Sequence, residues 1–351
     1  MRFLFSRLPL RRGAARSRRR RPIGAVDRRR FHVKQSFFVL VVPLCLSGLT
    51  LGSEYPNKPI RFIVAGPAGG ASDIPARIVA QKLVEGLRQQ IVVDNRPGAA
   101  GRIGSELAAR TAPDGYTILL ISTAYAINPS LYRHLPYDPV KDFTPVASLI
   151  NVCNVLVAHP SVPAKSVKDV IRLAKSRPGA LNFASGGTGT GIHLSGELFK
   201  TMSGIDIVHV PYKGTTPALV DVMSGQVPLM FVNLPPAMPL IKSGKVRVLA
   251  VTCVKRSRFL PDVPTVSESG LPGYEADGWF GVVTSVGTPT AVTTRLNQEI
   301  NRILNMADVR EQLSKTGAEP FITTPERFGA YIKLQITKWS AVVRASGARA
   351  D

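Results

Sequence analysis

Strand-like and helix-like segments alternate along this chain from residue 60 to residue 251, and the alternation is the strongest constraint on its fold. Short apolar runs such as "IRFIVA" (60–65) and "TILLIS" (117–122) are separated by segments with apolar residues at helical spacing, such as 73–87. Repeated strand–helix–strand order is typical of a sheet with helices on both faces. The sequence therefore predicts an α/β protein with parallel-rich sheets.

The predicted elements form two series, separated by a proline-rich connection. The first series has strands at 60–65, 91–95 and 117–122 and helices at 73–87 and 101–110. The second has strands at 154–159, 181–184, 206–210, 228–232 and 245–251 and helices at 166–176, 191–202, 215–224 and 236–243. The tail, 289–345, reads as nearly all helical. Two doubly wound units of this kind are typical of ligand-binding proteins whose lobes close about a hinge.

This organisation sets the expected domain boundaries. We expect a basic leader with an export signal in 1–52, the first part of lobe 1 in 53–153, and lobe 2 in 154–277. The last segment, 278–351, is expected to return to lobe 1 and to contribute the C-terminal helices.

The positive charge of the chain is concentrated at its N-terminus. Of the formal net charge of +22, residues 1–34 carry thirteen Lys or Arg and one Asp, a net +12, which leaves +10 for the rest. The remainder has no signature of a nucleic-acid-binding module. We therefore expect no nucleic-acid partner.

The order of the first segments predicts export. A basic stretch precedes the apolar run 35–52, which is followed by polar residues, as in a signal peptide. The paired Arg28 and Arg29 resemble a twin-arginine signal, but the Sec route stays open, and a membrane anchor is the alternative to cleavage. Because 1–25 makes the signal long, Val26 is a possible natural start. We expect a periplasmic protein.

The cysteines are interpreted in the light of export. Cys45 leaves with the signal, so that Cys153 and Cys253 remain. They could pair in an oxidising compartment. Since both lie in apolar, strand-like stretches, two buried free thiols are the favoured interpretation.

Two glycine-rich turns connect predicted strands to predicted helices. They are "GPAGGASD" (66–73) and "ASGGTGTGIH" (184–193). The second has the glycine spacing of a phosphate-binding loop, but Ile192 and His193 stand where that loop needs Lys and Ser or Thr. Backbone N–H groups at helix N-termini favour an anion without any lysine. We expect these N–H groups to point into a cleft between the lobes and to bind a carboxylate.

Particular residues are expected to contribute to this site. In the first turn, Gly69 and Gly70 allow close backbone approach, Ser72 can donate its hydroxyl, and Asp73 caps its helix or accepts a hydrogen bond from a water. Lys213, after Tyr212 in "PYKG", is the candidate for a second carboxylate, with an exposed lysine as the alternative.

The second turn contributes its own candidates. Ser185, Thr188 and Gly189 precede the helix 191–202. His193 lies in the first turn of that helix, where capping or orienting is favoured over metal binding.

Several enzyme classes lack their usual residues. The chain has no Gly-x-Ser-x-Gly, no His-Glu-x-x-His, no Cys-x-x-Cys and no Gly-x-Gly-x-x-Gly. We therefore expect no catalytic residue, no metal site and no cofactor, and a binding protein rather than an enzyme. A carboxylate sensor, or with less support an exported α/β hydrolase, is the alternative.

From Tyr55 onward the chain resembles the solute receptors of tripartite tricarboxylate transporters, the Bug family. The resemblance rests on several blocks that occur in order: "YPNKPIRFIVAGPAGGASDIPAR", "VVDNRPGAAGRIGSELAARTAPDGYTILL", "LNFASGGTGTGIHLSGELFK", "VHVPYKGTTPAL", "LPDVPTVSESGLPGYE" and "WFGVVTSVGTP". It implies a type II periplasmic-binding-protein fold, with a carboxylate held between the two turns, partly through ordered water. It also implies delivery to separate membrane permease subunits. By position, the family site falls on Gly69, Gly70, Ser72, Asp73, Ser185, Gly187, Thr188, Gly189 and His193.

One block departs from the family pattern. In "GQVPLMFVN" (225–233), Pro228 and Val232 replace residues that are commonly polar in relatives. Val232 is expected to line the cleft and to make the distal part of the pocket more apolar. We expect a monomeric receptor for a di- or tricarboxylate or a related organic acid.

Overall fold

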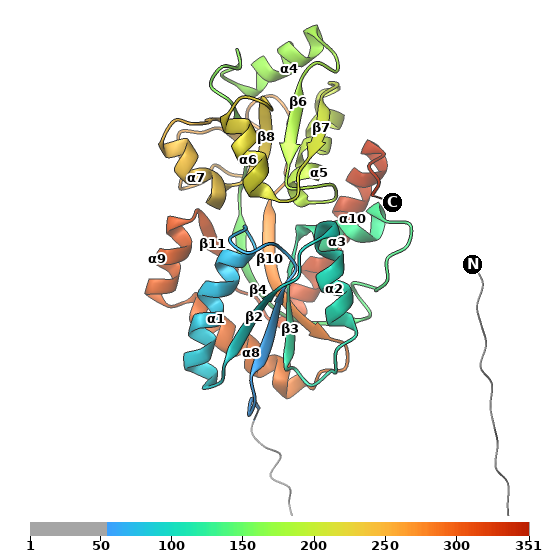
Figure 1. The fold of residues 1–351 in the computed structure, drawn as a ribbon, viewed down its shortest axis with the longest axis vertical. Coiled ribbons are helices and arrows are strands. Elements are labelled where there is room, and N and C mark those ends of the chain that lie inside the picture. Colours follow the sequence, from blue (N-terminus) through green and yellow to red (C-terminus); the bar gives the residue numbers. More distant parts are fainter. Residues whose placement is uncertain (1–54, 351) are drawn as a thin grey trace, which may run out of the picture. The chain divides into compact units, whose positions relative to one another are not determined.

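Two mixed β-sheets form the framework of the part of the chain that the structure describes, one of six strands and one of five. The computed structural model describes residues 55–350 (Figure 1). The predicted leader, 1–52, lies outside the described residues. Within the part described, no helix is both long and apolar enough to span a bilayer.

The first sheet has the strand order β11-β4-β10-β3-β1-β2. Its strands are β1 (Ile60–Val64), β2 (Ile91–Asn95), β3 (Thr117–Ser122), β4 (Phe143–Val152), β10 (Gly278–Ser285) and β11 (Ala318–Pro320). The helices that accompany it are α1 (Asp73–Leu87), α2 (Arg102–Ala109), α3 (Thr123–Leu131), α8 (Thr290–Leu304), α9 (Ala307–Lys315) and α10 (Pro325–Ser346), with the short 3₁₀ helix η1 (Ala99–Gly101) before α2. We call this part lobe 1.

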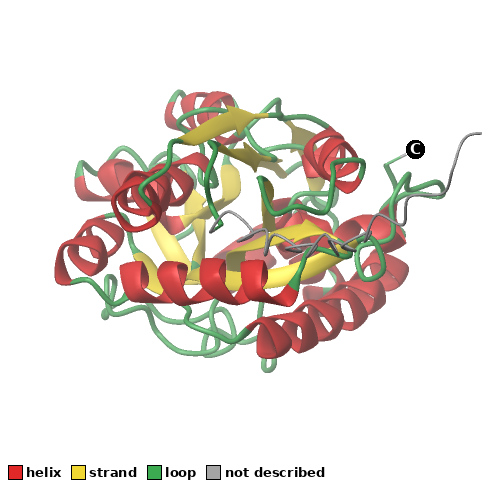
Figure 2. Cartoon of the chain, turned by 90° about the horizontal axis from the view of Figure 1, so that it is seen from below, coloured by secondary structure: helices red, strands yellow, loops and turns green. Residues whose placement is uncertain are grey.

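The second sheet, in lobe 2, has the order β7-β6-β8-β5-β9. Its strands are β5 (Asn154–Ala158), β6 (Asn182–Ser185), β7 (Val208–Pro211), β8 (Leu229–Asn233) and β9 (Arg247–Val251). Its helices are α4 (Val167–Ser176), α5 (Gly191–Ser203), α6 (Thr215–Met223) and α7 (Leu234–Lys242). Helices flank the strands on both sides (Figure 2). The inner strands β5, β8 and β10 are buried along nearly their whole length, as expected of strands covered on both faces.

The prediction of parallel-rich sheets is wrong. β1 pairs in parallel with β2 and β3, and β6 with β7 and β8, but β10 is antiparallel to β3 and β4, and β5 is antiparallel to β8 and β9. The reason is topological. β4 carries the chain out of lobe 1 and β10 brings it back, so the two strands run in opposite directions.

The proline-rich connection between the two predicted series contains elements that we did not predict. α3 lies there, with Pro129 inside it, and β4 follows. The strands β10 and β11 were also missed. α3 packs against α10, which is far away in sequence, so a tertiary contact and not local propensity stabilises this helix.

The long helix α10 packs against both lobes. It contacts α3 and β4 in lobe 1 and α5 in lobe 2. Its Gln335 accepts hydrogen bonds from the indole N–H groups of Trp279 (3.3 Å) and Trp339 (3.0 Å), and all three side chains are buried. This shared acceptor satisfies two buried donors at once.

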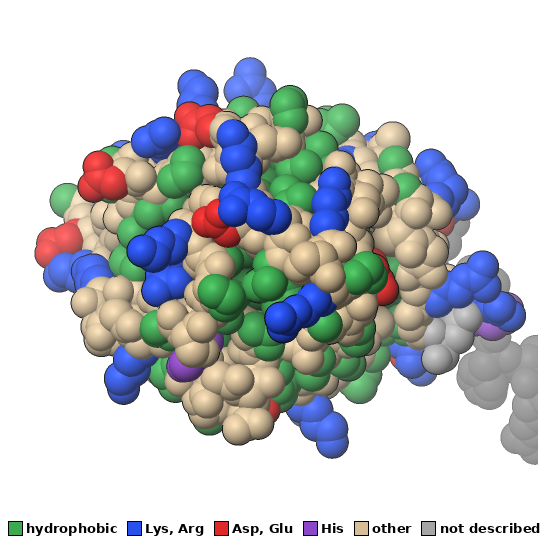
Figure 3. Space-filling model, turned by 90° about the horizontal axis from the view of Figure 1, so that it is seen from above, with side chains coloured by type: hydrophobic (Ala, Val, Ile, Leu, Met, Phe, Trp, Pro, Cys, Tyr) green, Lys and Arg blue, Asp and Glu red, His purple; other side chains and the backbone are tan. Residues whose placement is uncertain are grey.

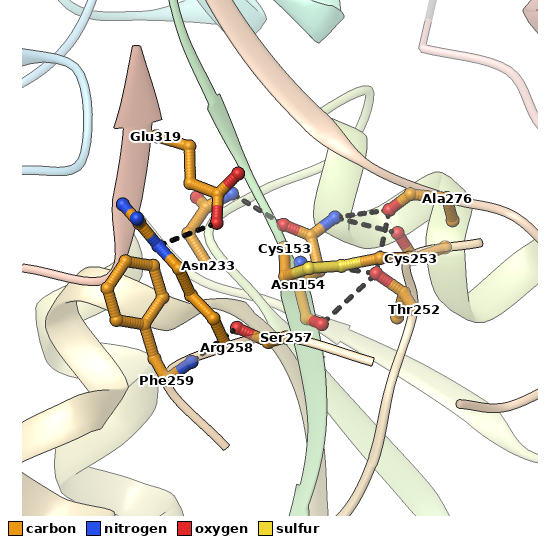
Figure 4. The surroundings of a disulfide bond; sticks show 11 residues. Cys153, Asn154, Asn233, Thr252, Cys253, Ser257, Arg258, Phe259, Ala276 and Glu319 are labelled. Carbon is orange, nitrogen blue, oxygen red and sulfur yellow. Dashed lines mark hydrogen bonds and ion pairs between the residues drawn. A yellow bond between two sulfur atoms is a disulfide. The ribbon is translucent and has the colours of Figure 1, made fainter. Parts of the chain in front are cut away.

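The structure joins Cys153 and Cys253 in a disulfide, so the favoured interpretation of two free thiols is wrong. Cys153 is the one residue between β4 and β5, and Cys253 follows β9 (Figure 4). The antiparallel register pairs Val155 with Val251, and two residues further on it places the cysteines opposite each other, with 5.5 Å between their Cα atoms. A prediction of mainly parallel strand pairing does not place the two cysteines opposite each other.

Asp277 lies beside the disulfide, directly before β10, where the chain returns to lobe 1. Its Oδ1 is buried and has no hydrogen-bond partner within the described residues. Burial, reinforced by Glu275 and opposed by Lys338, raises the pKa of Asp277 from an ordinary 3.8 to about 7. The native state therefore binds this proton more tightly than the unfolded state does.

We expect Asp277→Asn to stabilise the protein in a pH-dependent way. Because the native pKa lies above the unfolded one, stability is lost as pH rises from about 4 to 7. Removing the carboxyl should raise the free energy of unfolding by up to about 4 kcal/mol at pH 8 and by much less at pH 4. Urea unfolding at both pH values measures this, with the exposed Asp262→Asn as the control. An equal effect at both pH values would contradict the assignment.

Candidate functional site

A cavity of about 680 Å³ lies between the two lobes. The lining residues of lobe 1 are 65–67, 70–72, 97–101 and 122–124. Those of lobe 2 are 186–188, 190–192, 212–215 and Asn233. Tyr132, Asn154, Gly278 and Phe280 complete the lining. The lining is rich in glycine and alanine, so backbone groups form much of its surface.

Helix N-termini from both lobes lie at the lining of this cavity. In lobe 1 they are those of α1, α3 and the η1–α2 pair, and in lobe 2 those of α5, α6 and α7. Each N-terminus carries unsatisfied N–H groups and the positive end of a helix dipole. Lys213 is the one charged side chain among the residues that line the cavity. The cavity is therefore built to favour an anion.

The first turn is organised by Asp73, which is buried and does not line the cavity. Its carboxylate accepts hydrogen bonds from the Gly69 N–H (2.8 Å), the Asn95 amide (2.9 Å) and the Arg77 guanidinium (2.8 Å). Burial disfavours the ionised form, but these hydrogen bonds outweigh it and lower the pKa of Asp73. Asp73 thus holds the turn in shape instead of facing the ligand or a ligand-bound water.

The second turn is held in the same manner by buried side chains beneath it. The Gly187 N–H donates to Ser185 Oγ (3.1 Å), and the Gly189 N–H donates to His193 Nδ1 (3.2 Å). Thr190 caps α5 by accepting from the His193 N–H at 3.3 Å. Of the residues predicted here, Gly187 and Thr188 line the cavity, whereas Ser185, Gly189 and His193 lie behind it.

These contacts narrow the expectation that the backbone N–H groups of both turns point into the cleft. The N–H groups of Gly69, Gly70, Gly187 and Gly189 all donate within the protein. Free donors instead belong to their neighbours. Within the described residues, no acceptor is found for the N–H groups of Ala71, Ser72, Thr188 and Ile192, which line the cavity. The glycines shape the turns, and the adjacent residues present the amides.

A third loop in lobe 1 lines the cavity and was not predicted. It spans 97–101, and both Ala99 (φ 46°) and Ala100 (φ 51°) have left-handed backbone conformations. Non-glycine residues in this region carry strain, which the surrounding structure must hold. The signal was present in the sequence as "RPGAAG" between a predicted strand and a predicted helix.

Tyr212 and Lys213 both line the cavity, on the lobe 2 side. The Tyr212 hydroxyl donates to Asp221 (2.6 Å), and burial together with this carboxylate raises the pKa of Tyr212 to about 12. The Lys213 side chain is exposed and makes no hydrogen bond or ion pair with any described residue. Its ammonium group is available to a ligand.

The expectation that Val232 lines the cleft is wrong. Its side chain is fully buried in the core of lobe 2, where β8 pairs with β5. The next residue, Asn233, lines the cavity instead, and its amide donates to Asn154 (2.6 Å), as Figure 4 shows. Side chains alternate along a strand, so a polar residue at 233 and not the apolar residue at 232 reaches the site.

A two-lobed α/β fold with an anion-favouring cavity between its lobes is the architecture of solute-binding receptors. The model of the tripartite tricarboxylate transporter family receptor matches residues 75–348. The chain belongs to this family, so the resemblance and the fold class predicted from the sequence are confirmed.

Individual relatives support the assignment. BugT of Bordetella pertussis is 39% identical over 297 residues, which cover 84% of this chain and 91% of BugT. The structure of R. palustris Rpa4515 with adipate has 38% identity and a TM-score of 0.81, covering 84% of this chain and 99% of Rpa4515. MatC of Rhodopseudomonas palustris with bound malate has 31% identity and a TM-score of 0.77, covering 82% and 100%.

We expect Gly189→Val to separate the lobes. A Cβ on Gly189 would lie 2.4 Å from Leu131 Cδ2 and 3.2 Å from Ala100 Cβ, both in lobe 1. The substitution therefore disturbs the contact between lobes instead of filling the ligand's place, and the radius of gyration from small-angle scattering should increase.

Gly204→Val is the matched control for this experiment. Gly204 has a similar positive φ of 62°, against 82° for Gly189, but a Cβ there meets no atom within 4 Å. Both variants should lose about 1–2 kcal/mol from the left-handed backbone. If both gave the wild-type scattering curve, Gly189 would not control the lobe contact.

Proposed function

We propose that this chain is an exported receptor that captures a small organic acid in the cavity and delivers it to the permease subunits of a tripartite transporter. The observation that carries the proposal is the convergence of helix N-termini from both lobes on a cavity lined by one cationic side chain and no anionic one. Receptors of this family are periplasmic and bind small carboxylates, which supports export and the ligand class.

One carboxylate of the ligand binds between the two turns. The free N–H groups of Ala71 and Ser72 in lobe 1 and of Thr188 and Ile192 in lobe 2 are its donors. Gly70, Gly187 and the Ser72 hydroxyl lie beside them. Hydrogen bonds to a charged acceptor contribute about 1.5–3 kcal/mol each. A ligand that bridges both turns stabilises the closed arrangement, because these donors come from different lobes.

The remainder of the lining restricts the rest of the ligand. No Asp or Glu lines the cavity, so a ligand ammonium group would have no charged partner there. Lys213 offers a cation for a second carboxylate, and the side chains of Ile192 and Phe280 give apolar contacts. We therefore propose an amine-free dicarboxylate or a related acid. Adipate and malate, which occupy Rpa4515 and MatC, belong to this chemical class.

A thermal-shift screen followed by calorimetry tests this function. A ligand at 100 times its dissociation constant adds about 2.7 kcal/mol of stability. Mono-, di- and tricarboxylates should stabilise the protein, and amino acids of equal length should not. If no carboxylate at millimolar concentration raises the unfolding temperature, the proposed function is wrong.

Lys213 is tested with a matched pair of ligands, adipate and hexanoate, which differ by one carboxylate. We expect Lys213→Ala to weaken adipate binding by about 1–3 kcal/mol and to leave hexanoate binding nearly unchanged. Isothermal titration measures both, and Lys175→Ala on α4, outside the cavity lining, is the control. Equal losses for the two ligands would mean that Lys213 does not contact the second carboxylate.

A further inference from the structure

A cluster of buried and half-buried polar side chains lies directly beneath the second turn. Ser185 at the end of β6, His193 in the first turn of α5, and His209 in β7 meet there. The Ser185 hydroxyl lies 2.7 Å from His209 Nε2, and the two imidazole rings stack with their centroids 3.9 Å apart and their planes 28° apart. His209 does not line the cavity, and no sequence motif pointed to it.

The hydrogen bonds of the turn require particular protonation states. Since the Gly189 N–H donates to His193 Nδ1, that nitrogen carries no proton, and the neutral ring is protonated on Nε2. Nε2 faces Glu197 Oε1 at 3.7 Å. Ser185 Oγ accepts from the Gly187 N–H at 3.1 Å and shares a hydrogen bond of 2.7 Å with His209 Nε2, in a direction set by the His209 tautomer. The Gly187 carbonyl lies 3.2 Å from the same hydroxyl.

The surroundings keep both rings neutral. His193 is buried, and Lys200, paired with Glu197 at 3.2 Å on the same helix, adds a positive charge nearby. From the strand side, Phe183 packs against His209 without charge. Burial, with His209 and Lys200, lowers the pKa of His193 to about 3, and burial with Lys200 lowers that of His209 to about 4.

We propose that His193 and His209 are positioning residues for ligand binding, which hold the Gly189 and Gly187 N–H groups inward so that the Thr188 N–H faces the cavity. His193 acts directly on Gly189. His209 acts through the Ser185 hydroxyl on Gly187, so a side chain outside the cavity lining controls the shape of the turn. This inference rests on the proposed function, because it assigns the turn to the ligand.

A double-mutant cycle between Ser185→Ala and His209→Phe tests the relay. Phenylalanine keeps a ring to stack on His193 but removes the ring nitrogen that hydrogen-bonds with the Ser185 hydroxyl. We expect each single variant to weaken binding of adipate, or of the best ligand from the screen, about tenfold, the loss of one hydrogen bond. The double variant should also lose about tenfold, because both changes break the same relay.

A conservative variant separates positioning from general packing. His209→Gln offers an amide that can either accept from or donate to the Ser185 hydroxyl, and it should recover part of the affinity lost in His209→Phe. The exposed His134→Phe is the control and should bind normally. A hundredfold loss in the double variant, with no recovery in His209→Gln, would overturn the relay.

The tautomers are measured without any ligand, so the test does not depend on the proposed function. Long-range ¹H–¹⁵N NMR spectra should show His193 neutral and protonated on Nε2 from pH 8 to pH 5. If no carboxylate binds but this tautomer is found, the proposed function fails and the assignment of the turn's hydrogen bonds stands. A His193 that titrates near its ordinary value of 6.5 would overturn the inference.

Discussion

The cavity depends on backbone amides at helix N-termini for its attraction to anions. A charged side chain brings its own hydration and flexibility, whereas an amide at the start of a helix is fixed by the whole element. The buried side chains of Asp73 and His193 accept hydrogen bonds from the N–H groups of Gly69 and Gly189, respectively. These internal hydrogen bonds fix the neighbouring amides in place. The site is therefore organised from behind, by groups that do not line it.

Buried polar contacts also organise the connection between the lobes. Asn154, 1% exposed, begins β5 immediately after the disulfide-bonded Cys153. Its amide donates to the Ala276 carbonyl (2.7 Å) and accepts from Asn233 (2.6 Å), so it ties the outgoing chain to the returning chain and to the cavity lining. The Arg258–Glu319 ion pair (2.9 Å) also links the lobes but is half-exposed and contributes little. On the face seen in Figure 3, Lys and Arg side chains are spread over the surface and do not gather in one patch. Buried polar contacts at the crossing, more than surface charges, define the arrangement of the lobes.

The sequence predicted those features that depend on local pattern. Helix 73–87 and strands 91–95 and 117–122 match the structure residue for residue, since apolar periodicity and turn residues specify them locally. Both glycine-rich turns were also found. The strands β4 and β10 were missed, and with them the antiparallel register that brings Cys153 opposite Cys253. The pairing and register of strands that are far apart in the sequence cannot be predicted from the residue pattern of either strand alone.

Among the site residues, too, some could be predicted from local sequence pattern, whereas others depend on contacts between distant segments. Glycine spacing identified the turns, but which N–H groups stay free depends on side chains that approach from elsewhere: Asn95 from β2 for Asp73, and His209 from β7 for Ser185. The prediction for Val232 was wrong for a related reason. Successive side chains of β8 point to opposite faces, so Val232 faces the core and Asn233 faces the cavity. A sequence can therefore indicate that a turn binds an anion before it can indicate which atoms do so. The N–H groups that remain free for a ligand are those that do not already donate to an acceptor within the protein.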